Sequence, residues 1–62
     1  MRYKISARSS AGPISASRDG PVKAVDKAIE YITFGMRDVH ITDVETGRIY
    51  QSDEFELLLK AD

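Results

Sequence analysis

Cationic side chains recur at even-numbered positions near the start of this 62-residue sequence. Arg2, Lys4 and Arg8 alternate there with apolar residues such as Tyr3 and Ile5. Side chains two positions apart point to the same face of a strand, so a strand in this segment would gather the cations on one side. Cations gathered in this way can bind phosphate groups, which makes nucleic-acid recognition one chemistry to consider.

Catalytic and metal-binding groupings are sparse in this sequence. It holds one histidine, His40, and no cysteine. A zinc site requires several imidazole or thiolate ligands, and a nucleophilic serine requires a base beside it. The carboxylates of residues 38–45 and 53–56 lack the alternating spacing and glycine turn of a calcium loop. We therefore expect a non-catalytic protein, not an enzyme, with no metal and no other cofactor.

The composition is typical of one folded domain and differs from that of a polycation or a membrane protein. Nine Lys and Arg against ten Asp and Glu leave a formal net charge of -1, which provides no general attraction to nucleic acid or anionic lipid. The longest aliphatic run, residues 57–59, is far too short to span a bilayer. Residues 1–6 show no apolar run of the kind found in secretory signals. We expect a single small domain, residues 1–62, in the cytoplasm and without a membrane partner.

Alternating residues and turn residues predict two hairpins. Polar and apolar residues alternate over residues 2–8 and again over residues 14–18, with turn residues between them. Residues 39–44 and 48–51 are typical of a second pair of strands joined near Gly47. Pro13 has no backbone N–H to donate, so the second strand is expected at an edge of the sheet.

The segment between the two hairpins predicts an amphipathic helix. Pro21 suits the first helical position, and Gly35 can take the left-handed conformation that ends a helix. Apolar residues follow at spacings of three and four: Val22, Val25, Ile29, Ile32 and Met36. We expect this stripe to pack against the sheet.

The predicted elements together define an α+β fold, a two-layer ββαββα sandwich. Its four-stranded antiparallel sheet has the order 2-1-3-4 and is covered on one face by the long helix. A short C-terminal helix is expected to begin at Ser52 or Asp53, with Glu56 completing a capping box. Phe55, Leu58 and Leu59 form its apolar face. A helix of about eight residues is unstable alone in water, so this face is expected to dock onto the rest of the domain.

The register of the second hairpin has two alternatives. A three-residue loop places Ile49 on the same face as Val39 and Ile41. A two-residue loop places Tyr50 on that face instead. We favour the first alternative because it buries three aliphatic side chains together.

In the favoured register, the sheet face turned away from the long helix is basic. The candidate binding face consists of Arg2, Lys4, Arg8, His40, Arg48 and Tyr50. A chain this short buries a small core, and self-association is one way to add stability. We therefore expect a protein-interaction module that forms a homodimer or binds a protein partner. The alternative is a weak nucleic-acid-binding domain, in which the cations contact phosphates and Tyr50 stacks on a base.

Overall fold

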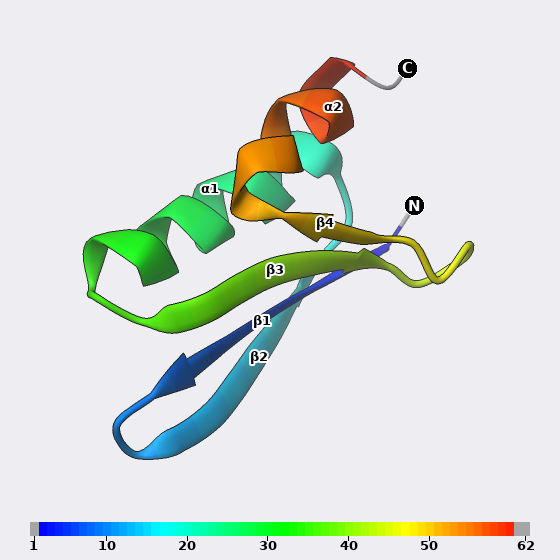
Figure 1. Ribbon diagram of the computed structural model, residues 1–62. Helices are drawn as coiled ribbons and strands as arrows, with labels where there is room; N and C mark the ends of the chain where they lie inside the picture. The colour runs from blue at the N-terminus through cyan, green and yellow to red at the C-terminus, as the bar shows by residue number, and fades with distance from the viewer. Residues whose placement is uncertain (1, 61–62) are drawn as a thin grey trace.

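The computed structural model describes residues 2–60, which form a four-stranded antiparallel sheet with helices on one side (Figure 1). The elements are β1 (Tyr3–Ser9), β2 (Gly12–Arg18), α1 (Pro21–Thr33), β3 (Arg37–Asp43), β4 (Ile49–Gln51), the 3-10 helix η1 (Ser52–Glu54) and α2 (Phe55–Lys60). The strand order β2-β1-β3-β4 and the α+β class confirm the fold predicted from the sequence. Residues 1, 61 and 62 of the expected domain lie outside the described residues.

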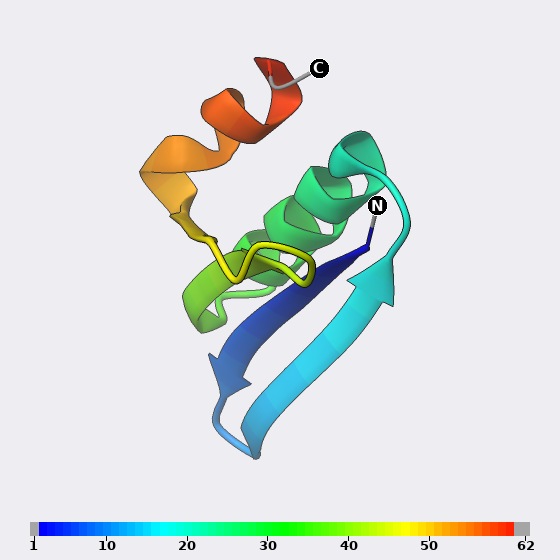
Figure 2. The same ribbon diagram turned by 90° about the vertical axis from the view of Figure 1, so that its right-hand side faces the viewer.

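β1 lies in the middle of the sheet, as its alternation of polar and apolar residues predicts. Tyr3, Ile5 and Ala7 are buried on the helix side, whereas Lys4 and Arg8 are exposed on the opposite side. β2 pairs with one edge of β1 and β3 pairs with the other, both antiparallel. Figure 2 shows β1 and β2 side by side along their length. β2 is an edge strand, which agrees with the missing backbone donor of its proline.

α1 packs on the sheet through a different face from the one predicted. Its buried residues are Ala24, Val25, Ala28 and Tyr31. Val22, Ile29 and Ile32 are 61%, 50% and 44% exposed, so the prediction that the whole Val22–Met36 stripe contacts the sheet is wrong. The buried side chains of α1 belong to one cluster with those of β1 and β3, where small and large residues pack together. Val25 belongs both to the predicted stripe and to the buried face of α1. Met36, the last residue of the predicted stripe, is half-buried against the core.

The ends of α1 follow the sequence signals. Pro21 is the first helical residue, as predicted. At the other end, Gly35 has a φ of +80°. Its N–H donates to the carbonyl of Ile32 at 2.9 Å, and the N–H of Met36 donates to the carbonyl of Tyr31 at 3.1 Å. These two bonds form a Schellman motif, which requires the left-handed conformation that glycine adopts without strain.

The β3–β4 hairpin adopts the register that we did not favour. Ile41 lies opposite Tyr50, and Thr42 lies opposite Ile49. Tyr50 is therefore buried on the helix side, whereas Ile49 is 51% exposed. The predicted burial of Ile49 beside Val39 is wrong.

Asp43 provides the physical reason for this register. It is buried, and its Oδ1 accepts the backbone N–H of Glu45 at 2.9 Å and that of Thr46 at 3.4 Å. Its own N–H donates to the carbonyl of Arg48 at 2.8 Å, which closes a four-residue loop over 44–47. A shorter loop that paired Asp43 with Ile49 would lose this closing bond to Arg48. The carboxylate that satisfies the loop amides thus fixes which residue of β4 enters the core.

α2 docks onto α1 and β4 through part of its predicted apolar face. Phe55 and Leu58 are buried, whereas Leu59 is 45% exposed. The turn that leads into α2 is capped two residues earlier than predicted, because the Glu54 side chain accepts the N–H of Gln51 at 3.0 Å. Neither helix within residues 2–60 combines the length and the apolar character needed to cross a bilayer.

Burial raises the pKa of the Tyr3 phenol above the ordinary tyrosine value, and the nearby Asp43 carboxylate adds to this shift. The folded state therefore holds the Tyr3 proton at a pH where the unfolded chain has released it. We expect the free energy of unfolding to fall as the pH rises above about 10. Urea titrations across this range should show a smaller decline for Tyr3→Phe than for the wild type. An identical decline in both proteins would contradict this assignment.

Candidate functional site

A row of polar side chains crosses the sheet on the face turned away from the helices. Ser6 in β1 lies opposite Ser15 in β2 on one side and opposite His40 in β3 on the other. His40 in turn lies opposite Gln51 in β4. The antiparallel register thus brings two hydroxyls, an imidazole and an amide from four strands into one line.

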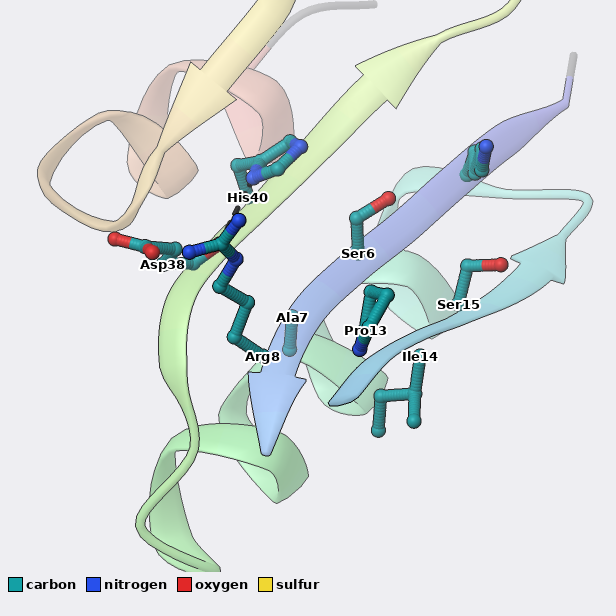
Figure 3. Close-up of a pocket in the computed structure, with 9 residues that line it drawn as sticks. Ser6, Ala7, Arg8, Pro13, Ile14, Ser15, Asp38 and His40 are labelled. Atoms are coloured by element: carbon teal, nitrogen blue, oxygen red, sulfur yellow. Dashed lines mark hydrogen bonds between the residues drawn. The ribbon is translucent and has the colours of Figure 1, made fainter. Parts of the chain in front are cut away.

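Two cations lie on either side of this row. Lys4 precedes Ser6 by two positions and Arg8 follows it by two, so both point to the same face of β1. Both are exposed, and within residues 2–60 neither forms an ion pair or a side-chain hydrogen bond. Together with Ser6, Ser15 and His40 they line a shallow hollow of about 680 Å³, which we call the outer-face hollow (Figure 3).

A β-bulge forms one wall of the outer-face hollow. The β1–β3 pairing shifts between Ser6 and Arg8, because Asp38 and Val39 together lie opposite Ala7. Asp38 has a φ of +54°, the left-handed conformation that glycine usually supplies in such a bulge. Aspartate is one of the few other residues that tolerate this conformation.

The backbone at the bulge orients His40. The imidazole Nδ1 lies 2.8 Å from the carbonyl oxygen of Asp38. A carbonyl oxygen can only accept, which assigns the ring proton to Nδ1 and leaves Nε2 for a ligand or solvent. The orienting group is thus a backbone carbonyl, in contrast to the buried carboxylate that orients the histidine of a catalytic triad.

The structure brings together only part of the predicted binding face. Lys4, Arg8 and His40 line the outer-face hollow. Arg2 lies just before β1, where its Nε is 4.0 Å from the Oδ1 of Asp19. Since both of these side chains are largely exposed, this ion pair contributes little to stability.

Arg48 and Tyr50 do not belong to this face, which corrects the prediction. Tyr50 is 7% exposed and lies on the helix side of the sheet. The guanidinium carbon of Arg48 lies 4.6 Å from the centre of the Tyr50 ring, in the geometry of a cation–π contact. The register of the β3–β4 hairpin moves both side chains away from Lys4 and His40.

A second exposed surface was not predicted from the sequence. We call Val22, Ile29 and Ile32 the α1 apolar edge, because all three are large, apolar and exposed. The charged side of α1 borders β2, where Lys23, Lys27 and Glu30 line a groove with Arg18. At 100° per residue, the α1 apolar edge lies on the other side of the helix, toward α2, which contacts α1.

A sequence signal for this surface does exist. The apolar residues of α1 form two adjoining stripes, one through residues 24, 28 and 31 and one through residues 22, 29 and 32. Together the two stripes cover a wider part of the helix surface than the single stripe that a surface helix usually buries. One of the two stripes therefore had to remain exposed.

Searches of protein-family models, curated proteins and solved structures with this chain found no match.

Proposed function

We propose that this chain is a small, non-catalytic protein-interaction module that self-associates as a homodimer through the α1 apolar edge. The observation that supports this proposal is the exposure of Val22, Ile29 and Ile32 on a helix whose opposite face covers the sheet. The surface helix of a monomer usually turns its aliphatic side chains inward, but α1 buries Ala24, Val25, Ala28 and Tyr31 and leaves these three outside. Grouped apolar exposure of this kind is typical of interaction sites.

A second copy is the partner that the fold favours. The largest fully buried side chains are Ile5, Ile41 and Leu58, and much of the remaining core consists of alanine and tyrosine. Domains of this size commonly gain stability from disulfides, metals or oligomers, and this sequence has no cysteine. The cytoplasm is therefore the compartment that we propose.

The α1 apolar edge is suited to a two-fold symmetric contact. In an antiparallel pair of α1 helices, Val22 of one copy would lie near Ile32 of the other, with Ile29 near the symmetry axis. Each copy would then supply the same patch, as a symmetric dimer requires. Association would remove these side chains from water and stabilise the folded chain by mass action.

Sedimentation or light scattering across a wide concentration range tests the proposal. The mass is expected to rise from the 6.9 kDa of the monomer toward twice that value. Ile29→Lys should weaken association by at least about tenfold, because it places a charge at the centre of the contact. Ile29 is half exposed, so circular dichroism should show the variant folded.

Glu30→Lys is the control, since Glu30 is exposed on the charged side of α1 that borders β2 and lies about 100° around the helix from Ile29. It should associate like the wild type. A monomeric mass for the wild type at near-millimolar concentration would exclude the homodimer.

A second candidate function is weak nucleic-acid binding through the outer-face hollow. The observation in its favour is that Lys4, Arg8 and His40 share one hollowed face. Tyr50 is buried, so binding would depend on phosphate contacts without a stacked base and would weaken steeply with salt. An oligonucleotide titration at low salt that moves none of the amides of these three residues would exclude it.

A further inference from the structure

The two cations of the outer-face hollow are placed to act on one ligand. Lys4 and Arg8 are four residues apart on β1, so their Cα atoms are about 13 Å apart along the strand. Both long side chains flank Ser6, and within residues 2–60 no carboxylate is paired with either of them. An anion seated above Ser6 would lie within reach of both.

Neutral donors occupy the floor of the hollow between the cations. Ser6 and Ser15 lie directly opposite each other, and both line the hollow. Each hydroxyl can donate one hydrogen bond. His40 closes the other side of the row, with its Nε2 left for a ligand by the bond between Nδ1 and the carbonyl of Asp38. Hydrogen bonds from the two serine hydroxyls to an ionised oxygen are shorter and stronger than those between neutral groups.

The charges around the hollow indicate which anion would fit. Among the lining residues of the described chain, Asp38 on β3 carries the one carboxylate, opposed by Lys4 and Arg8 on β1. Arg37 lies opposite Arg8 in the β1–β3 register, on the far side of the bulge. The β2 residues lining the hollow are neutral, and Gln51 of β4 opposite His40 is neutral too. Lys4, Arg8 and Asp38 therefore give the lining a net charge of about +1.

We propose that the outer-face hollow binds a small tetrahedral dianion, the chemistry of a phosphomonoester or a sulfate. Lys4 and Arg8 supply the charge, and Ser6 and Ser15 donate hydrogen bonds. Two cations match a single dianion of charge near -2 more closely than they match an extended polyanion. The net charge of -1 on the whole chain and the buried Tyr50 ring also favour a small ligand over nucleic acid.

Amide chemical shifts during a sulfate titration of the full chain test this assignment, with sodium chloride of equal ionic strength as the reference. The amides of Ser6, Ser15 and His40 should shift saturably with sulfate and not with sodium chloride.

Matched variants identify the residues that bind sulfate. Arg8→Gln should weaken sulfate binding severalfold, whereas Lys23→Gln should leave it unchanged, since Lys23 is an exposed cation on α1. The monomeric Ile29→Lys variant should bind sulfate like the wild type, which keeps this test separate from that of the homodimer. Phosphoserine should bind at the same amides, as expected for a phosphomonoester ligand.

Three results would overturn the assignment. The first is the absence of saturable shifts at the hollow, and the second is equal weakening by Arg8→Gln and Lys23→Gln. The third is an oligonucleotide that binds more than about tenfold more tightly than sulfate, with an affinity that falls steeply as salt rises. That third result would assign the face to nucleic acid.

Discussion

Replacing Leu58 by alanine is expected to lower the free energy of unfolding by about 2–5 kcal/mol. Leu58 is 1% exposed and is one of the largest fully buried side chains of the domain. The substitution would remove part of the core cluster to which Leu58 belongs and leave a cavity that a small core cannot easily refill. Because small domains are stable by only a few kcal/mol, a large fraction of the chains would unfold. Urea denaturation followed by circular dichroism measures the change.

The adjacent residue provides the control for this substitution. Leu59 is 45% exposed, so Leu59→Ala should change the free energy of unfolding by less than about 1 kcal/mol. Both variants replace leucine by alanine in the same helix, so both change helix propensity equally. A difference between their free energies of unfolding therefore reports the burial of Leu58. Equal losses at Leu58 and Leu59 would show that α2 docks in another orientation.

Replacing Tyr50 by alanine is expected to cost about 3–5 kcal/mol, the range observed for large aromatic side chains in cores. Tyr50 is buried on the helix side, opposite Ile41. The substitution also removes the ring on which the Arg48 guanidinium stacks. Thermal denaturation at neutral pH should show a large fall in melting temperature.

Ile49→Ala tests the same hairpin from the opposite face. Ile49 is 51% exposed, so this variant should lose less than about 1 kcal/mol. A larger loss for Ile49→Ala than for Tyr50→Ala would support the register in which Ile49 faces Val39. These two variants therefore decide whether Tyr50 is available on the basic face to stack on a base.

The central part of the candidate site could be predicted from the sequence. The alternation around Lys4 and Arg8 places both cations on one face, and this holds for any strand that buries Tyr3 and Ile5. His40 joins them because Ile41 and Val39 must face the core. Period-two geometry alone therefore identifies these three members of the outer-face hollow.

The contribution of β4 to the site could not be predicted in the same way. A change of one position in the pairing moves every side chain of a strand to the other face. Ile49 and Tyr50 are both suitable core residues, so hydrophobicity did not distinguish the two registers. The distinction came from the hydrogen bonds that Asp43 makes to the loop amides, which are not apparent from residue types.

The face of α1 was ambiguous for a related reason. Hydrophobicity favoured the stripe with valine and isoleucine, whereas the structure buries the stripe with Ala24, Ala28 and Tyr31. How closely a helix approaches a sheet depends on the shapes of both surfaces, and the side chains of β1 and β3 leave room for small residues. Packing shape therefore outweighed total hydrophobicity.

Local signals in the sequence determined the elements, their order and the antiparallel topology, because alternation, proline, glycine and helical spacing act over a few residues. Only the tertiary structure decided which side of α1 faces solvent, whether Ile49 or Tyr50 enters the core, and how the bulge at Asp38 orients His40. Each of these outcomes depends on contacts between segments distant in the chain, where alternatives of similar hydrophobicity differ in shape and hydrogen bonding.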